Sequence, residues 1–181
     1  MSVVANASAA PEAAPPPAVL GEDQVIRGLE LGLTRLVSTG AIADARGALI
    51  LSTNLAMLGV LLASAPSVLA MRGAWLLVTV TALCCLGSVA AVALAALPRA
   101  APARPSIVFF AGISRLSRDA YLQRLCSISP GEYLGDLAEQ CHSVARLTTF
   151  KFRCVRIAMI LLVIAAVPWL ACLFLAGRLT G

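Results

Sequence analysis

The residues best suited to bind a phosphate-bearing ligand lie between the second and third hydrophobic runs of the chain. Arginine presents forked N–H donors that match phosphate oxygens, and a tyrosine ring offers a face on which a base can stack. The polar residues that could serve in this way are Arg115, Arg118, Tyr121, Arg124, Gln140 and Lys151. The simpler alternative is a solvated helix surface whose charge only follows the bias of membrane proteins toward basic cytoplasmic loops.

The sequence carries no signature of catalysis or metal binding. It contains no phosphate-loop glycine motif, no nucleophile elbow, no H-E-x-x-H pair and no C-x-x-C pair. His142 is the only histidine, and three of the six cysteines lie within hydrophobic runs, where a thiol behaves as a small apolar group. We therefore expect neither an enzyme nor a bound metal or cofactor.

A second set of residues is placed where it could couple one segment to another. Asp44 and Arg46 immediately precede the first hydrophobic run, and Asp136 lies ahead of the third. Asn54 lies within the first run, where an amide seeks a partner and commonly joins helices. Small residues spaced four apart also suit helix association, within one chain or in a homo-oligomer. They are Ala48, Ser52 and Ala56, and Gly87, Ala91 and Ala95.

The composition places these residues in a membrane protein. The 181 residues are 60% hydrophobic and 13% charged, and the mean hydropathy of +0.90 is above that of ordinary soluble domains. The lipid bilayer is therefore an expected partner. The net charge of +5 fits basic cytoplasmic loops better than a nucleic-acid partner, which we do not expect.

The elements that must position the candidate residues follow from the hydrophobic pattern. Residues 1–20 are rich in Ala and Pro and lack a basic start, so they predict a disordered tail rather than a signal peptide. Residues 21–46 have apolar positions at helical spacing and predict a cytoplasmic amphipathic helix. Three runs are long enough to cross a hydrocarbon core. The predicted transmembrane helices are 47–65, 74–97 and 157–177.

Residues 98–156 are predicted to form a cytoplasmic helical head and a stem. In "SISPGEYL" the serine at 129 is the cap, Pro130 occupies the first helical position and Glu132 completes a capping box. No helix breaker follows until Pro168, so the stem should continue unbroken into the third span. The predicted fold class is an all-α membrane protein with three transmembrane helices and a helical head.

A shorter helix is predicted earlier in the same segment. Ser117 is suited to cap it, and Leu122 and Leu125 supply apolar positions. Because apolar stripes in water need mutual burial, we expect the segment from Ile107 to Leu125, which includes this helix, to pack against the helix at 21–46 and against the stem.

The orientation follows from the distribution of basic residues. Twelve of the fourteen lie before the first span or between the second and third, or at the borders of these segments. Only Arg72 and Arg178 lie on the opposite side. The positive-inside rule predicts a multi-pass protein of the cell (inner or plasma) membrane, with the N-terminus and residues 98–154 cytoplasmic and the C-terminus outside.

Several segments together resemble the transmembrane effectors of Pycsar antiphage systems. They are "ADARGALILSTNLAMLGVLLA" from Ala43, "SIVFFAGIS" from Ser106, "SRDAYLQRL" from Ser117 and "GDLAEQCHSVARLTTFKFRCVRIAM" from Gly135. The resemblance implies that a partner pyrimidine nucleotide cyclase makes cyclic UMP or cyclic CMP on phage infection. The effector would bind that nucleotide, impair the cell membrane and cause abortive infection.

Two other classes of function remain open at the level of the sequence. The apolar stripe of the stem would also suit a membrane anchor or scaffold that recruits a cytosolic partner. A transporter component is a third reading, although transporters usually carry repeats and broken spans, and only Pro168 interrupts a span here.

Overall fold

The computed structural model describes residues 21–69, 73–97 and 106–180, and within them it contains helices and no strands. The helices are α1 (Glu22–Leu69), α2 (Ala74–Ala96), α3 (Phe110–Ile113), α4 (Arg118–Ser127) and α5 (Pro130–Thr180). Three of them, α1, α2 and α5, are long and apolar enough to cross a membrane. The predicted all-α membrane fold is confirmed, while the predicted tail at 1–20 lies outside the described residues.

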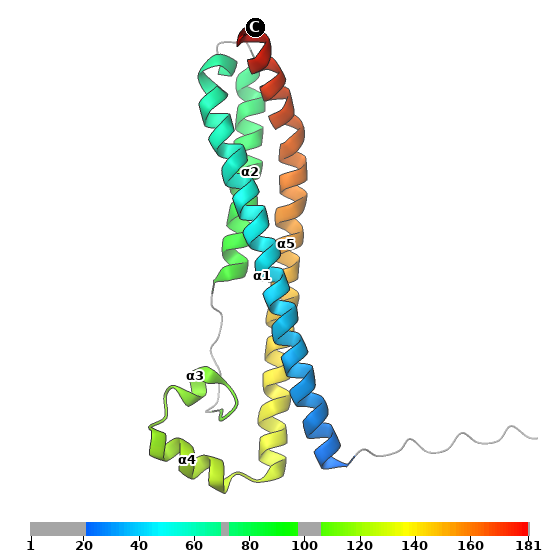
Figure 1. The fold of residues 1–181 in the computed structure, drawn as a ribbon, viewed down its shortest axis with the longest axis vertical. Helices are drawn as coiled ribbons and strands as arrows, with labels where there is room; N and C mark the ends of the chain where they lie inside the picture. Colours follow the sequence, from blue (N-terminus) through cyan, green and yellow to red (C-terminus); the bar gives the residue numbers. More distant parts are fainter. Residues whose placement is uncertain (1–20, 70–72, 98–105, 181) are drawn as a thin grey trace, which may run out of the picture.

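Two long rods, α1 and α5, run parallel through the length of the molecule, and α2 returns beside their apolar ends (Figure 1). At 1.5 Å per residue, the 48 residues of α1 extend about 72 Å and the 51 residues of α5 about 77 Å. A hydrocarbon core is only about 30 Å thick, so each rod has more than half of its length outside it. The 23 residues of α2 extend about 35 Å, which suffices for one crossing.

The predicted continuity of the stem with the third span is confirmed, and its start is the predicted capping box. The hydroxyl oxygen of Ser129 accepts from the Glu132 N–H at 3.3 Å, and Oε2 of Glu132 accepts from the Ser129 N–H at 3.0 Å. Pro130 occupies the first helical position, where its missing N–H has no helical partner to lose.

Both rods pass through a proline. The first hydrophobic run suggests an end at Pro66, but α1 continues through this residue to Leu69. Pro66 lacks the N–H that would bond to the carbonyl four residues earlier, so α1 loses one hydrogen bond there, and only three residues of the helix follow it. Pro168 lies inside α5, and the next residue, Trp169, donates its indole N–H to the Met57 carbonyl of α1 at 3.1 Å.

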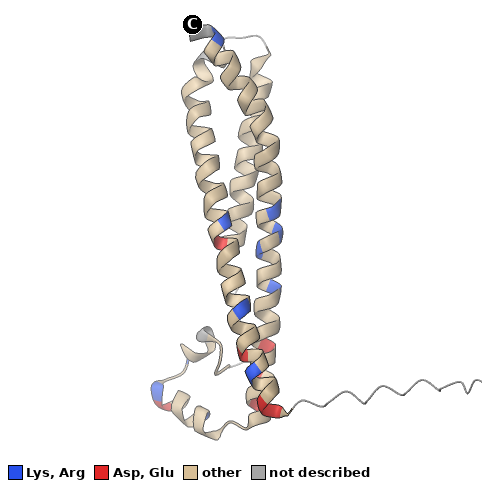
Figure 2. Ribbon diagram, turned by 45° about the vertical axis from the view of Figure 1, so that its right-hand side comes forward, with Lys and Arg blue, Asp and Glu red and all other residues tan. Residues whose placement is uncertain are grey.

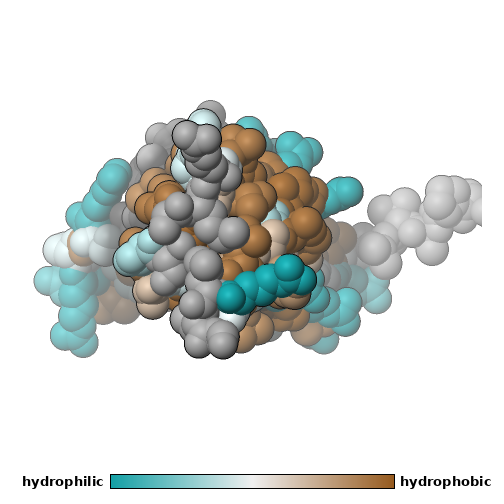
Figure 3. Space-filling view, turned by 90° about the horizontal axis from the view of Figure 1, so that it is seen from above, coloured by the Kyte–Doolittle hydropathy of each residue, from teal (hydrophilic) through white to brown (hydrophobic). Residues whose placement is uncertain are grey.

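The core of the molecule lies between the three spans. One cluster joins Ile50 of α1, Val92 of α2 and Ala158 of α5, and two further clusters continue toward the C-terminal end of the bundle. The outer surface is apolar as well: Leu62 and Val167 expose 74% and 72% of their surface. Seen from the end where the C-terminus lies, hydrophobic side chains surround the bundle (Figure 3). Lipid is the solvent that such a surface requires.

The two sets of small residues have different places in this bundle. Ala91 and Ala95 are buried, and a Cβ on Gly87 would lie 3.3 Å from Leu161, so the set on α2 packs within the chain. The set on α1 faces outward. A Gly residue is also required at 73, where φ is +86° at the start of α2, because other residues rarely adopt this conformation.

Candidate functional site

Residues 106–109, which we call the docked loop, are fixed to the side of α5 by one carboxylate. Oδ2 of Asp136 accepts from the Ser106 hydroxyl at 2.9 Å and from the N–H groups of Ile107 and Val108 at 2.8 and 3.3 Å. The Ser106 hydroxyl oxygen also accepts from the Val108 N–H at 3.1 Å. A single charged group therefore supplies hydrogen-bond acceptors to a segment that has no helix or strand of its own.

The docked loop is closed by a glycine that leaves no space for a side chain. A Cβ on Gly112 would lie 2.9 Å from the Ser106 nitrogen and closer still to the Ser106 carbonyl oxygen. Because these neighbours are backbone atoms, they cannot move aside without displacing the loop. The glycine that ends the aromatic run "IVFFAG" is the sequence signal that could have pointed to this close approach. Ser106 was not among the residues predicted to be functional.

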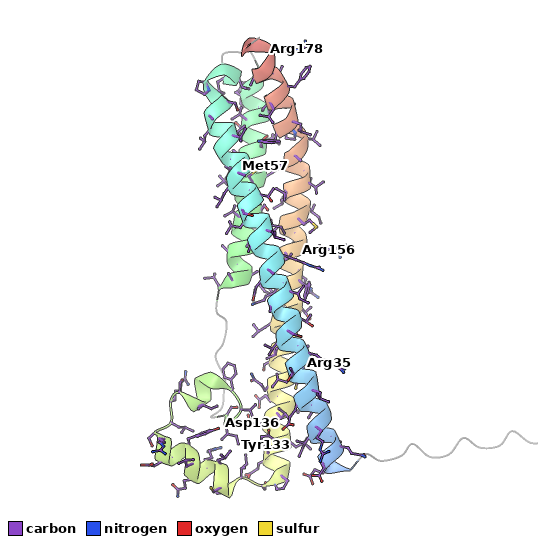
Figure 4. All side chains as sticks on the ribbon, in the orientation of Figure 1. Arg35, Met57, Tyr133, Asp136, Arg156 and Arg178 are labelled. Carbon is purple, nitrogen blue, oxygen red and sulfur yellow. The ribbon has the colours of Figure 1, made fainter. Side chains whose placement is uncertain are left out.

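An open cavity of about 480 Å³ lies between α4, the docked loop and the first turns of α5. Its volume is in the range of small-molecule sites. Asp136 has two roles: its carboxylate accepts hydrogen bonds from the docked loop, and it lines the cavity (Figure 4). The lining residues are Ile107, Arg124, Ser127, Ile128, Glu132, Gly135, Asp136 and Glu139.

The expectation that residues 107–125 pack against α1 and the stem holds only for their start, because Ile107 is buried and bonded to Asp136 of α5, whereas α4 does not pack there. No residue of α4 is buried, and Leu122 and Leu125 expose 45% and 46% of their surface. The apolar stripe of the stem is already covered by α1, so no apolar surface remains there to receive α4. Its predicted cap is confirmed, since the Ser117 hydroxyl oxygen accepts from the Ala120 N–H at 3.2 Å.

The structure separates the six residues predicted to bind a ligand. Of these six, Arg124 lines the cavity. Arg118 is exposed at the other end of α4, Arg115 is exposed in the turn before this helix, and Gln140 and Tyr121 are half-buried. Lys151 lies farther along α5, where Nζ donates to both carboxylate oxygens of Asp44 at 2.7 and 2.8 Å.

Tyr133 links the first turn of α5 to α1 by a hydrogen bond. Its hydroxyl donates to Oε1 of Glu30 at 3.1 Å (Figure 4). Burial raises the pKa of the Tyr133 hydroxyl, and the hydrogen bond to the Glu30 carboxylate and nearby charges, including those of Asp136 and Tyr121, raise it further. The hydroxyl therefore stays protonated and keeps donating throughout the physiological range.

The capping box of α5 makes the first turn of the stem sensitive to acid. The backbone N–H and the hydroxyl of Ser129 both donate to Glu132 and hold the pKa of its carboxyl below its usual range, with a smaller contribution from Arg124. The stabilisation is present above the ordinary glutamate pKa of about 4.3 and is lost as pH falls through the lower pKa of the folded state.

We expect an NMR titration to show this loss as a shift of the Ser129 amide resonance when the pH falls below the ordinary glutamate pKa of about 4.3. The substitution Glu132→Gln should abolish that titration, whereas Glu139→Gln, on the same helix, should leave it in place. An unchanged Ser129 titration in Glu132→Gln would contradict the assignment.

Further hydrogen bonds join α1 and α5 between the cavity and the membrane. The Cys141 thiol contacts the Leu29 carbonyl at 3.4 Å, and burial raises the pKa of this thiol, so it remains protonated and can donate. The Lys151–Asp44 ion pair follows near the start of the spans. Arg46, the other residue predicted to couple the segments here, is exposed. The two rods are thus fixed to each other along the stem.

Asn54 joins all three spans through a buried polar network. Its Nδ2 donates to the Ile50 carbonyl at 2.8 Å and to the Ser88 hydroxyl at 2.9 Å, and the Ser88 hydroxyl donates to the Ala158 carbonyl at 2.8 Å. Both polar side chains are fully buried. The expectation that Asn54 finds a partner on another helix is confirmed, and its partner Ser88, the central residue of the network, was missed from the sequence.

The match to known proteins covers these features together. The family model described as the Pycsar effector protein domain, PycTM, matches residues 33–178. This range includes the three spans, the docked loop, the cavity and the Asn54 network. No curated protein and no solved structure matches the chain. The chain therefore belongs to the Pycsar effector family and is an effector of antiphage defence with three apolar helices that can span a membrane.

Proposed function

We propose that a cyclic pyrimidine mononucleotide, cyclic UMP or cyclic CMP, activates this effector to impair the cell membrane and cause abortive infection. The nucleotide would come from a partner pyrimidine nucleotide cyclase that responds to phage. Membership of the Pycsar effector family supports the signal and the cyclase. The structural observation that carries the proposal is the unbroken α5, which lines the cavity at one end and crosses the membrane at the other.

The cavity offers groups that suit the two halves of such a ligand. Arg124 and Ser127 supply donors for the cyclic phosphate. Glu132, Asp136 and Glu139 would repel the phosphate but can accept from the ribose hydroxyl and from the N–H groups of a base. The phosphate should therefore lie toward α4 and the base or the ribose toward α5. A ligand held in this way would draw α4 toward the stem.

We expect Arg124→Gln to weaken binding of the activating nucleotide by about tenfold to a hundredfold, because one charge-assisted contact is lost. Calorimetry on the purified protein with cyclic UMP and cyclic CMP measures this change. Arg118→Gln is a matched control, since it removes the same charge from the same helix at an exposed position outside the cavity lining. Equal binding by the Arg124→Gln and wild-type proteins would place the ligand elsewhere.

Membrane impairment is tested in cells that co-express the effector with a pyrimidine nucleotide cyclase. We expect entry of a membrane-impermeant dye only when both proteins are active, and a catalytically dead cyclase provides the control. If an active cyclase and a folded effector together admit no dye, the proposed membrane impairment is wrong.

The proposed orientation places the head in the cytoplasm, where a cyclase product would accumulate. Cys126 is the exposed cysteine of α4, so it reports directly on the location of the head. We expect a membrane-impermeant maleimide to label Cys126 in broken cells but not in intact spheroplasts, and Cys126→Ser to abolish that labelling. Equal labelling of Cys126 in intact spheroplasts would reverse the orientation.

The alternative of a scaffold that binds partners through its stem has less support. Leu137, on the apolar stripe of the stem, exposes only 1% of its surface, and Cys141 on the same stripe contacts Leu29 of α1. The stripe that suggested a partner from the sequence is thus occupied by the protein's own first helix.

A further inference from the structure

Three exposed arginines lie on α1 and α5 near the level at which α2 ends, and we call them the arginine collar. They are Arg46 on α1 and Arg153 and Arg156 on α5. Figure 2 shows basic residues of the two rods gathered near the middle of the molecule, and Figure 4 shows Arg156 pointing away from the bundle. The collar is separate from the cavity at the far end of the stem.

Contacts between the spans fix the level of the collar. A Cβ on Gly47, the neighbour of the collar residue on α1, would lie 3.4 Å from Val92 of α2. Val155, which lies between the two collar residues on α5, packs in one cluster with the same valine. Since α2 ends at Ala96, four residues later, the collar lies within about 6 Å of the end of this span.

The collar differs from Lys151 and Arg178 in having neither an ion-pair partner nor an aromatic partner among the described residues. The ammonium group of Lys151 is paired with Asp44 at 2.7 Å. At the opposite end of the bundle, the Arg178 guanidinium stacks over the Phe174 ring at 4.5 Å from its centre. The collar guanidinium groups therefore retain their donors for a group outside the chain.

The bilayer supplies that group at this depth. The 23 residues of α2 extend about 35 Å, slightly more than a hydrocarbon core of about 30 Å, so its last turn lies in the headgroup region. Arginine side chains extend from such positions toward lipid phosphates, and their forked donors match phosphate oxygens. We propose that the arginine collar binds the phosphodiester groups of anionic phospholipids and so fixes the depth of the bundle in the membrane.

Spin-labelled phosphatidylglycerol and phosphatidylcholine, followed by electron paramagnetic resonance in vesicles containing the full chain, test the proposal. We expect the wild-type protein to prefer the anionic lipid, and R46Q/R153Q/R156Q to reduce that preference by roughly tenfold to a hundredfold. R46K/R153K/R156K should retain only part of it, because the charge remains but the forked donors do not. Helix content measured by circular dichroism shows that each variant is folded.

R27Q/R35Q/R146Q is the matched control, because it removes three exposed arginines from the same two rods away from the bilayer. An equal loss in this control would mean that only net charge acts, and would overturn the proposal. An unchanged preference in R46Q/R153Q/R156Q would also overturn it. So would displacement of the spin-labelled lipid by millimolar inorganic phosphate, because the collar would then bind free phosphate rather than lipid.

Discussion

Glycine pairs placed at one level of both rods are expected to abolish the proposed membrane permeabilisation while leaving membrane insertion intact. The double-hinge variant replaces Leu147 and Thr148 of α5 and Ser38 and Thr39 of α1. Each glycine is about 1 kcal/mol less favourable in a helix than the alanine of the control variant. The hinges lie side by side, because a Cβ on Gly40 would lie 3.6 Å from the Thr148 hydroxyl oxygen. Movement of the head would then bend the stem instead of shifting the spans.

A hinge in α5 alone should have a smaller effect. Hydrogen bonds join α1 to α5 on both sides of residue 148, at Cys141 and at Lys151. An intact α1 would therefore keep a hinged α5 straight. We therefore expect the α5 hinge to reduce dye entry and the double hinge to eliminate it, at equal expression and with nucleotide binding retained.

Alanine pairs at the same four positions provide the control, because they remove the same side chains but preserve the helices. Full dye entry in the double-hinge variant would show that the rods do not carry the signal.

The second large effect is expected from Asp136→Ala, which should release the docked loop from α5. The substitution leaves three donors, from Ser106, Ile107 and Val108, without their charged acceptor. We expect the loop to lose about 3 kcal/mol of stabilisation and to become sensitive to limited proteolysis. Because the loop links α2 to α4, the response to nucleotide should be lost as well.

Asp136 also lines the cavity, so a second variant must separate loop docking from ligand contact. Gly112→Ala meets this need, since it leaves the carboxylate in place but forces the new Cβ against the Ser106 backbone. We expect the same proteolytic sensitivity from both variants. Asp119→Ala, which removes an exposed carboxylate from α4, should resemble the wild-type protein. A protected loop in Asp136→Ala would contradict the anchoring role.

The start of α5 and the class of fold could be predicted because they depend on local chemistry. The capping box at Ser129 and Glu132 involves residues three apart, and it sets the start of the stem wherever the rest of the chain lies. The length and hydropathy of the spans are likewise local properties. For the same reason Asn54 could be singled out, since an amide within an apolar span needs a partner whatever that partner is.

The partners themselves were decided only by the tertiary structure. Helical periodicity tells which face of the stem is apolar but not what covers it, and α1, rather than α4, buries Leu137. Lys151 was grouped with the ligand candidates because it is basic, yet in the packed rods its ammonium group forms an ion pair with Asp44. Which distant residue covers an apolar face or pairs with a charge depends on how the helices pack. Helix packing is a property of the folded chain and not of any local stretch of sequence.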